Sequence, residues 1–396
     1  MENVNVLISG ASVGGPALAY FLNRYGFNVT VVERAPHLRP GGQAIDVRAA
    51  ALDVVEQMGV LDEMRRLRTD IRGMSIVDAS GKELYRTTEH TFTGGVIANS
   101  DVEILRDDLC SLIYEAGGDG IEYLFDDSIT SITQDEHTTR VTFENRAPRD
   151  FDIVVGADGL HSNVRRLVFG PESQFIHHLG GSYMGVFTAP NFLDLDHWQV
   201  YHQNEGAGGI IMSVRDDTEL RVYAGFFAEE PLDYDYRDLA AQKRIIADRL
   251  ANAGWEFPNA LKYMWDAPDF HFDSASQIRM DSWSRGSVVL LGDAGYCGSP
   301  LSGQGTSMAL IGAYVLAGEL KAAGGDHVAA FAAYEKELRG FIERNQDIAL
   351  ANVEERSARA EALADRSEAE IAQEMGEQGD HERFRDVVTS YSLKSY

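Results

Sequence analysis

The chain opens with two short apolar runs that are separated by a glycine-rich turn and an amphipathic segment. The first run covers residues 4–9, the amphipathic segment covers residues 16–25, and the second run covers residues 27–32. Short apolar runs on either side of a helix-period segment are typical of buried parallel strands joined by a crossover helix. The pattern therefore predicts strand, turn, helix and strand at the start of an α/β fold.

The turn between the first strand and the helix has the glycine spacing that suits a dinucleotide. Gly10 permits a tight turn, and Gly14 and Gly15 let the helix lie close to the strand. The free N–H groups of the helix start then face a pyrophosphate. We expect cofactor contacts from the following residues of the turn: Gly10, Ser12, Val13, Gly14 and Gly15.

Glu33 ends the second apolar run, where a carboxylate can accept hydrogen bonds from an adenosine ribose. An acid at this position favours an unphosphorylated ribose, as in FAD or NAD. Ser12 departs from the G-x-G-x-x-G fingerprint, which has its middle glycine there. Serine is small, and its hydroxyl can itself donate to a phosphate. The segment predicts a dinucleotide-binding βαβ unit.

The next part of the chain alternates between this unit and a second, sheet-rich region. Residues 39–47 form a glycine-containing loop that we expect near the ligand, and residues 49–58 form a helix. Polar and apolar residues alternate over 72–92 around a Ser-Gly turn, as in a hairpin. A helix opens at Glu103 and returns the chain to the first unit. Its apolar positions are Leu105, Leu109, Leu112 and Ile113.

Two or three strands are predicted over residues 121–143, and a buried strand over 151–156 runs into a Gly-Ala-Asp-Gly turn that contains Asp158. Open α/β sheets bind ligands at such carboxyl ends of strands. A helix follows from Ser162. Residues 175–227 are strand-like, notably over 198–202, 209–214 and 220–227. A helix over 240–253 and a strand over 276–280 complete this second region.

A third cluster begins with a buried strand that ends in Gly292-Asp293. A loop over 299–305 then runs into a helix whose Gly312 and Ala313 allow close packing, and whose start offers a second set of free N–H groups. Asp326 caps a long final helix. One face of that helix carries Val328, Phe331, Tyr334, Leu338 and Phe341. Beyond residue 364 the chain is highly charged, and we expect it to be only partly ordered.

These patterns predict an α/β protein whose domains interleave: a Rossmann-like domain, a sheet-rich domain, and a long C-terminal helix. The first domain takes residues 1–71, 101–173 and 281–325. The sheet-rich domain takes residues 72–100 and 174–280, and the helix with its charged tail takes residues 326–396.

Composition limits the classes of partner. The chain has 396 residues, 44% of them hydrophobic, and lacks both an apolar run of the ~20 residues that span a bilayer and a signal sequence. We therefore expect a cytoplasmic location. The net charge of −27 repels nucleic acid and anionic membranes. We expect small-molecule partners only, and a monomer or a homodimer.

Cysteine and histidine spacing indicates neither disulfides nor a metal. Cys110 and Cys297 are too few for a disulfide framework and lack metal-ligand spacing, so reduced thiols are expected. The adjacent His177 and His178 have no carboxylate or cysteine at metal spacing.

The three clusters, in this order, resemble those of the class A flavoprotein monooxygenases related to para-hydroxybenzoate hydroxylase. The resemblance covers residues 3–345 and is nearest to the tetracycline-inactivating and polyketide-hydroxylating members. It implies that Glu33 and Arg34 hold the ADP half of FAD, that Asp158 serves both FAD and the pyridine nucleotide, and that Asp293 binds hydroxyls of FAD. Tyr296 departs from the family's usual histidine.

The resemblance also implies cofactor contacts at Arg106, in Glu-Ile-x-Arg, and at the loop residues Arg39 and Asp46. In this family NADPH or NADH reduces the flavin, and a flavin C4a-hydroperoxide delivers one oxygen of O₂ to an electron-rich carbon. No catalytic triad is needed. Instead the 300–305 loop positions the flavin and stabilises charge on the reduced ring. Its residues in this role are Pro300, Gly303, Gln304 and Gly305.

Substrate contacts are expected on strands of the second region, where a polar group can help a phenol or enol to lose a proton. The candidates are Gln199, His202, Met212, Tyr223 and Phe226, with ordinary sheet packing as the alternative for each. Three functions compete. The first is an FAD-dependent hydroxylase of an aromatic or polyketide-like molecule, tetracycline-type antibiotics included. The second is an FAD-dependent reductase of an unsaturated lipid, and the third is a flavin-binding sensor without turnover.

Overall fold

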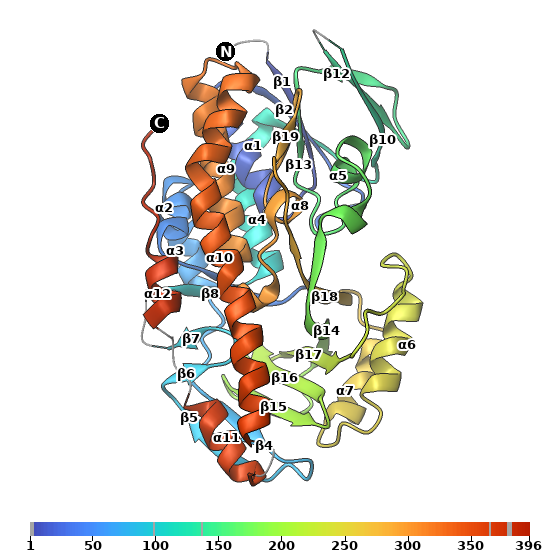
Figure 1. Cartoon of the computed structure of the whole chain (residues 1–396), viewed down its shortest axis with the longest axis vertical. Coiled ribbons are helices and arrows are strands. Elements are labelled where there is room, and N and C mark those ends of the chain that lie inside the picture. The colour runs from blue at the N-terminus through green and yellow to red at the C-terminus, as the bar shows by residue number, and fades with distance from the viewer. Residues whose placement is uncertain (1–3, 98–99, 136–137, 364–365, 378–381) are drawn as a thin grey trace.

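The strands of the protein form two main sheets, one in each half of an elongated molecule, and helix α10 (His327–Leu363) runs along both (Figure 1). The computed structural model describes residues 4–97, 100–135, 138–363, 366–377 and 382–396. The two halves are connected several times by the chain, as the interleaved sequence pattern indicates. The α/β class with a long C-terminal helix is confirmed.

The upper sheet has six strands in the order β19-β20-β13-β1-β2-β9, and every neighbouring pair is parallel except β19 with β20. Val6, Leu7 and Ile8 of β1 are fully buried within the hydrophobic core of this half. The strands are β1 (Asn5–Ser9), β2 (Asn28–Val32), β9 (Ile121–Leu124), β13 (Ile153–Gly156), β19 (Ser284–Arg285) and β20 (Val288–Leu290).

Helix α9 is the central helix of this half and packs against α1, α2 and α10. It is buried on nearly all sides, and its predicted close packing is confirmed at Gly312, where a Cβ would lie 2.1 Å from the Tyr296 hydroxyl. Within the described ranges, no helix is both long and apolar enough to cross a membrane. The helices of this half are α1 (Gly14–Arg24), α2 (Ala50–Gln57), α3 (Leu61–Arg66), α4 (Arg106–Gly117), α5 (Asn163–Val168), α8 (Asp293–Tyr296) and α9 (Gly305–Ala322).

The lower sheet has seven strands in the order β18-β14-β17-β16-β15-β4-β5, all antiparallel except β15 with β4. The predicted hairpin is present as β4 and β5. The strands are β4 (Met74–Val77), β5 (Glu83–Thr87), β14 (Ile176–Pro190), β15 (Gln199–Asn204), β16 (Ala207–Val214), β17 (Glu219–Phe227) and β18 (His271–Ile278). Helices α6 (Leu239–Arg249) and α7 (Phe257–Met264) cover one of its faces.

Small ribbons lie beside the two main sheets. Strands β3 (Ala44–Val47) and β8 (Val102–Leu105) form an antiparallel pair, as do β6 (His90–Thr91) and β7 (Gly95–Val96). Strands β10 (Ile129–Gln134), β11 (Thr139–Phe143) and β12 (Arg149–Phe151) make a three-stranded sheet.

The β3–β8 ribbon corrects two expectations. Residues 39–47 are not a loop throughout, because Ala44–Val47 form β3. The helix predicted from Glu103 begins at Arg106, because Val102–Leu105 form β8. A strand of four residues is too short for its hydrophobic pattern to be told apart from the first turn of a helix. Pairing with the partner strand therefore decides the conformation. Helices α3 and α7 were not predicted either.

The C-terminal part also differs from expectation. Asp326 caps α10 as predicted, with Oδ1 accepting from the N–H groups of Val328 and Ala329 at 3.0 and 3.3 Å. Val328 itself is 68% exposed, so the apolar face begins at Phe331. The charged tail forms α11 (Glu368–Gly376) and α12 (Glu382–Val388), because both find partners: α11 packs against β5 and α12 against α10.

Gly14 and Gly15 differ sharply in the space around them. A Cβ on Gly15 would lie 1.9 Å from the backbone oxygen of Gly10, whereas a Cβ on Gly14 would lie 3.5 Å from a methyl group of Leu291, an ordinary contact. Gly15 is therefore the residue that lets α1 approach β1.

Gly15→Ala should lower the free energy of unfolding of the apoprotein by about 1–3 kcal/mol, because α1 must move away from the strand. Gly14→Ala, one residue away, should change it by less than about 0.5 kcal/mol. Urea unfolding of both variants makes the comparison. Equal stability of the two would contradict this account of the turn.

Candidate functional site

The start of α1 is free to bind an anion. It has no capping side chain and no acidic residue in its first turn, so its N–H groups at Gly14 and beyond are unopposed by a carboxylate. Gly10 adopts a φ of 111°, and a Cβ there would lie 2.4 Å from the backbone oxygen of Ala157. A close backbone turn and an uncapped helix start fit the pyrophosphate of a dinucleotide such as FAD.

Glu33 lies where the sequence predicts, at the end of β2, and it ties the glycine turn to this strand. Its carboxylate accepts hydrogen bonds from the backbone N–H groups of Ala11 at 2.8 Å and Ala35 at 2.9 Å. The oxygens keep further lone pairs for a ribose hydroxyl. Arg34, next to it, is exposed.

Ser12 and Arg106 meet at a buried thiol. The Ser12 hydroxyl lies 3.7 Å from Cys110 Sγ, and Arg106 Nη1 lies 3.8 Å from the same sulfur. Burial raises the pKa of the Cys110 thiol, so it is protonated and can donate to Ser12. The Ser12 O–H is then available to a phosphate oxygen, as predicted for this departure from glycine.

Arg106 also supports the loop that precedes β3. Its Nη2 donates to the backbone oxygens of Gly41 at 2.5 Å and Arg39 at 3.2 Å. Gly42 has a φ of 109°, and a Cβ there would lie 2.3 Å from Arg106 Nε. The Arg39 side chain is exposed at this loop. The structure thus brings Arg39 and Arg106 together.

Asp158 uses its carboxylate within the protein. It accepts from the backbone N–H groups of Asn163 and Val164 at 2.9 and 3.0 Å and from the hydroxyl of Ser162, so it caps α5. Burial raises the pKa of this carboxyl. The neighbouring Arg165 is fully buried and donates to the Ala294 oxygen at 2.8 Å, which joins the second cluster to the third.

His161 joins the second cluster to the lower sheet, a role that sequence reasoning missed. Its Nδ1 lies 3.0 Å from Glu172 Oε1, and its Nε2 lies 3.2 Å from Asp273 Oδ2 on β18. Burial opposes protonation, but the hydrogen bonds to Asp273 and Glu172 raise the pKa of His161 to about 9. Glu172 is near in sequence, whereas nothing in the sequence marks Asp273 as a partner.

Asp293 and the start of α9 border the same space. The Asp293 side chain is exposed, and its Oδ1 would lie 4.0 Å from a Cβ on Gly305, the first residue of α9. Helix α9, like α1, begins without a capping side chain or an acid in its first turn. The loop before it contains Pro300 in a short 3₁₀ turn and Gly303 at a φ of 62°. Gln304 is buried at the helix start.

Two side chains of α10 donate hydrogen bonds to the loop over 300–305 and to the segment just before it. Asn352 Nδ2 donates to the Leu301 oxygen at 2.8 Å, and Gln346 Nε2 donates to the Cys297 oxygen at 3.1 Å. Sequence reasoning missed both, since polar residues within a long helix are usually solvent-exposed.

Three predicted substrate residues share the face of the lower sheet that is not covered by α6 and α7. Gln199 and Met212 are paired across β15 and β16, and Gln199 Nε2 lies 3.7 Å from the Met212 sulfur. Tyr223 belongs to the same cluster as Met212, and its hydroxyl accepts from the Ala44 N–H at 2.7 Å. This face therefore meets the β3–β8 ribbon.

Two of the five substrate candidates do not share this face, and for them the alternative of ordinary sheet packing holds. His202 and Phe226 lie on the opposite face, beneath α6 and α7. The His202 nitrogens contact the backbone oxygens of Val77 at 2.9 Å and Ala253 at 2.7 Å. Strand side chains alternate between faces, and each of these residues is an odd number of positions from its neighbour in the first group.

Asp46 lies on β3, with Oδ2 2.9 Å from Arg48 Nη2. Burial raises the pKa of Asp46 to about 7. The positive charge of Arg48 lowers this pKa, and the negative charge of Glu103 raises it further. It is therefore a carboxylate that titrates near neutral pH, beside the face that carries Met212 and Tyr223.

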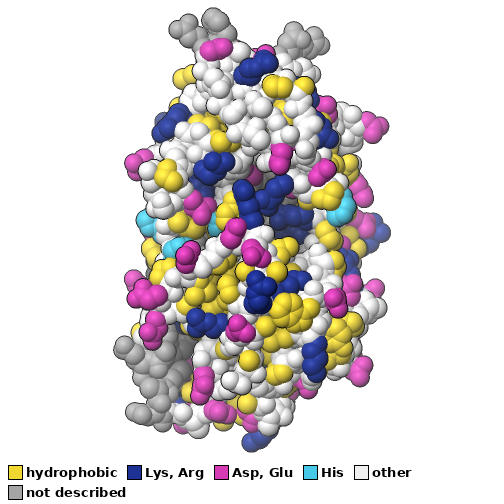
Figure 2. Space-filling view, turned by 90° about the vertical axis from the view of Figure 1, so that its right-hand side faces the viewer, with side chains coloured by type: hydrophobic (Ala, Val, Ile, Leu, Met, Phe, Trp, Pro, Cys, Tyr) yellow, Lys and Arg dark blue, Asp and Glu magenta, His cyan; other side chains and the backbone are white. Residues whose placement is uncertain are grey.

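Positive side chains gather on one face of this acidic protein. Figure 2 shows Lys and Arg near the middle of that face, next to a hollow lined by hydrophobic side chains, although the net charge is −27. Local positive potential attracts phosphate-bearing cofactors in spite of the overall charge.

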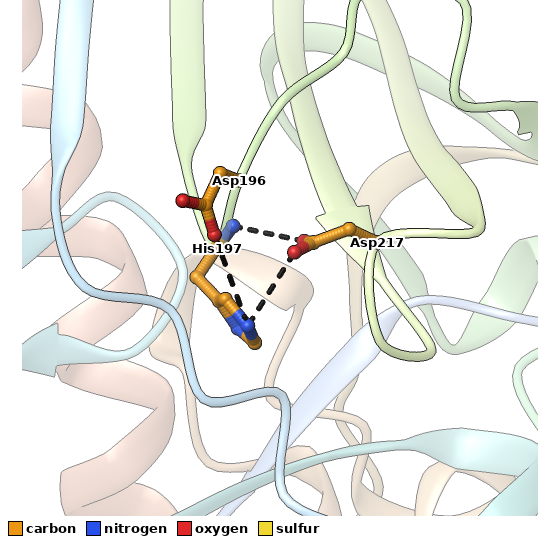
Figure 3. Close-up of side chains that lie close together, drawn as sticks. All are labelled: Asp196, His197 and Asp217. Atoms are coloured by element: carbon orange, nitrogen blue, oxygen red, sulfur yellow. Dashed lines mark hydrogen bonds and ion pairs between the residues drawn. The ribbon is translucent and has the colours of Figure 1, made fainter.

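A His and two Asp side chains also come together, although the sequence indicated no metal site. His197 Nε2 lies 3.4 Å from Asp217 Oδ2 and 4.0 Å from Asp196 Oδ1 (Figure 3). Asp217 Oδ1 also accepts from the His197 N–H at 2.8 Å. Ion pairing and this backbone bond account for the cluster, and Asp196 is 83% exposed. We assign no metal to it.

The chain is similar to known proteins over most of its length. The family of FAD binding domains matches residues 3–349. An uncharacterised protein of Mycobacterium tuberculosis is 56% identical over 348 residues, 88% of this chain and 93% of that protein. A flavin-dependent monooxygenase from an unknown prokaryotic organism is 44% identical over 343 residues, 86% of this chain and 87% of its own length. The crystal structure of the tetracycline destructase Tet(51) has a TM-score of 0.86 at 35% identity, covering 99% of this chain and 100% of that one.

The chain belongs to the FAD-binding family of class A flavoprotein monooxygenases. It is an FAD-dependent monooxygenase that takes NAD(P)H and O₂ as co-substrates and acts on a small molecule. The resemblance found from three short clusters is thereby confirmed over most of the chain.

Glu33→Ala should weaken FAD, because the ribose loses an acceptor and the glycine turn loses its tie to β2. The dissociation constant should rise by a factor on the order of 10–100, equivalent to about 1–3 kcal/mol. FAD titration of the apoprotein measures it. Glu122→Ala on neighbouring β9 is the matched control and should leave affinity unchanged; an unchanged constant for Glu33→Ala would remove Glu33 from the site.

Asp293→Ala should weaken FAD more than Glu33→Ala, since Asp293 opens onto the space at the start of α9. Its stability effect should be small. Asp326→Ala is the control, because it removes a helix cap and should cost ~1 kcal/mol of stability without changing FAD affinity. If Asp293→Ala behaves like Asp326→Ala in FAD titration and thermal melting, Asp293 is only a cap.

Proposed function

We propose that this monooxygenase hydroxylates an aromatic or enolic, polyketide-like molecule, with tetracycline-type antibiotics as the first candidates. The observation that carries the proposal is the meeting of the two halves beside the start of α9, where Tyr223 of the lower sheet contacts Ala44 of the β3–β8 ribbon and Arg48, directly after β3, contacts Ser307 of α9. Likeness to the tetracycline destructase Tet(51) over the full chain supports the candidate class.

Our proposal divides the site between the two sheets. The starts of α1 and α9, with Glu33 and Asp293, would hold FAD, and the loop with Pro300 and Gly303 would position its ring. Bound FAD supplies redox chemistry, in which its reduced form activates O₂ for transfer of one oxygen atom. We also propose the division of the chain into the residue ranges expected above.

The chain's own residues would position the bound groups. Gln199 and Met212 are fully buried by other parts of the protein, and the Gln199 amide already bonds to the Phe92 N–H at 2.7 Å and the Thr93 hydroxyl at 2.8 Å, so both support the site from within the fold. Backbone N–H groups at the uncapped start of α9 lie where they can stabilise negative charge on a bound ring. Tyr223 keeps its proton at neutral pH because burial raises its pKa, so it offers a hydroxyl rather than a phenolate.

The nicotinamide nucleotide would enter beside Arg39. This guanidinium is exposed on the loop that Arg106 holds, and a charge there suits a phosphate. For the remaining partners we propose a cytoplasmic monomer or homodimer that binds neither nucleic acid nor membrane, in keeping with a net charge of −27 and two free thiols.

Incubation with NADPH, a panel of phenols and tetracyclines, and labelled dioxygen should give a product heavier by one oxygen atom, and that atom should carry the label. Mass spectrometry of the product, together with substrate-stimulated oxygen uptake, makes the measurement.

The alternatives give different results in the same experiment. A saturated product without added oxygen would favour the reductase. FAD binding without substrate-stimulated oxygen uptake across the panel would favour the sensor. Oxygen that comes from water would exclude oxygen transfer by the flavin.

A further inference from the structure

His271 is a histidine of the lower sheet that shares a face with Tyr223. It is the first residue of β18, and its register partner on β14 is Val186, which in turn pairs with Tyr223 of β17. Residues directly opposite on neighbouring strands project from the same face of a sheet. The three side chains therefore form one row on the face that meets the β3–β8 ribbon.

The outer end of this row is open to solvent. Val186 and Tyr223 are buried, whereas His271, on the edge strand β18, is exposed. Phe272, the next residue, points to the other face and is buried in the core beneath α6 and α7. The ribbon thus covers the middle of the face and leaves the His271 imidazole accessible.

Contacts between the two halves of the molecule lie on both sides of His271 along the chain. Two residues before it, Asp269 lies so close to Gly41 of the loop before β3 that a Cβ on this glycine would overlap the carboxylate. Two residues after it, Asp273 Oδ2 lies 3.2 Å from His161 Nε2. His271 therefore lies at the boundary between the halves.

The imidazole is accessible and yet surrounded by protein. Although the His271 side chain is exposed, desolvation by the surrounding protein is the largest effect on its pKa and lowers it. Arg39 and Asp293 are exposed as well, and desolvation lowers the pKa of Arg39 and raises that of Asp293. Side chains with both properties line a hollow rather than a convex surface. Figure 2 shows such a hollow next to Lys and Arg side chains.

Electrostatic interactions connect these three side chains. The charge of Arg39 acts on His271, and the charge of Asp273 acts on both His271 and Asp293. We therefore place them in one hollow. Arg39 and Asp293 are the residues proposed above for the nicotinamide nucleotide and for FAD, so His271 faces the space where the reaction would take place.

The ring nitrogens of His271 are free to meet a ligand. Over the described ranges of the chain, no group forms a hydrogen bond or an ion pair with them. His161 and His202, by contrast, use both ring nitrogens for contacts within the protein. An accessible imidazole without a partner can exchange a proton with a bound molecule.

The charges around His271 are mainly positive. After desolvation, Asp273 on β18 itself raises the pKa of the imidazole, and three groups lower it: Arg39 from the loop before β3, Arg106 from α4 and His161 from the turn before α5. The neighbour on β14 is the apolar Val186. The pKa is lowered overall, so the imidazole is neutral at pH 7 and can accept a proton. The same positive charges stabilise an oxyanion beside it.

We propose that His271 is a catalytic residue of the hydroxylation, which accepts the hydroxyl proton of an enolic or phenolic substrate bound in the hollow between the two halves. This inference rests on the proposed function. It adds the side chain that the substrate oxygen contacts, and it requires a substrate whose ionisable hydroxyl is conjugated with the carbon that receives oxygen.

The step is a proton transfer without redox change. The substrate O–H bond breaks, the proton binds a ring nitrogen of His271, and the electron pair stays on the substrate oxygen, where it makes the conjugated carbon more nucleophilic. Transfer of one atom of O₂ to that carbon leaves the other atom to depart as water. The proton held by His271 is used in forming this water, so the imidazole ends neutral.

The pH dependence of kcat/KM tests the assignment, with the panel substrate that gives labelled product and with saturating NADPH. Wild type should lose activity as the pH falls, with a midpoint below 6.5, the ordinary pKa of histidine, because a protonated imidazole accepts no second proton. His271→Gln should lose this limb, together with a factor of at least about 100 in kcat/KM at pH 7.

The defect of His271→Gln should shrink as the pH rises toward the pKa of the substrate, because a substrate that is already ionised needs no base. A merely structural role would lower kcat/KM by the same factor at every pH, and this result would overturn the proposal.

His177→Gln is the matched control. His177 is an exposed histidine on β14, and its register partner Gln277 lies six residues along β18 from His271, a distance of about 20 Å. This variant should keep both the rate and the pH profile of wild type.

Chemical modification gives a readout without turnover. Diethyl pyrocarbonate acylates accessible, neutral imidazoles, and mass spectrometry of peptides from the FAD holoenzyme measures the rate at each histidine. The panel substrate, added without NADPH, should protect His271 in proportion to its occupancy and leave His177 unprotected. Equal rates at His271 with and without substrate would show that the substrate does not contact it.

The results separate this inference from the function on which it rests. If no panel member gives labelled product, the proposed hydroxylation fails and the role of His271 fails with it. If product forms, but His271→Gln keeps the wild-type pH profile or the substrate does not protect His271, the hydroxylation stands and the assignment of His271 is wrong.

Discussion

The close approach of helix α1 to strand β1 is the constraint on which the rest of this structure depends. It requires glycine at position 15, where a Cβ would lie 1.9 Å from the Gly10 oxygen. Only in this packing does the uncapped helix start point its N–H groups past the end of the sheet. The carboxylate of Glu33 then holds the turn through the Ala11 N–H. A single steric requirement thus places the helix dipole and the Glu33 carboxylate together.

Contacts of charged side chains join the clusters of the upper half to one another and to the lower sheet. Arg165 joins the second cluster to the third, and the imidazolium of His161 bridges Glu172 and Asp273 on β18. Loss of one partner from such a bridge is costly, because it leaves the other charge without compensation. Two sheets with separate cores are thereby tied together by the contact of His161 with Asp273.

Asp46 and Glu103 lie opposite each other on β3 and β8 and form a buried carboxyl pair between the two halves of the molecule. Both residues lie on a ribbon that is part of neither main sheet and is held between the first turn of α9 and the face with Tyr223. The boundary between the two halves buries carboxyl groups whose charge is not balanced, whereas the two hydrophobic cores consist mainly of apolar side chains. In this setting burial raises the pKa of both carboxyl groups.

The sequence by itself determined the elements whose signals are local. The βαβ unit, Glu33 at the end of its strand, and the cap at Asp326 follow from spacing within a few residues of each other, and the order of three clusters identified the family. Tertiary structure alone decided the β3–β8 ribbon, the helices of the charged tail, and the partners Asp273 and Asn352, which lie far from their contacts in sequence. It also separated Tyr223 from Phe226, since which face of a strand is open depends on what packs against it. Short strands and buried polar contacts are set by partners that only the folded chain brings together.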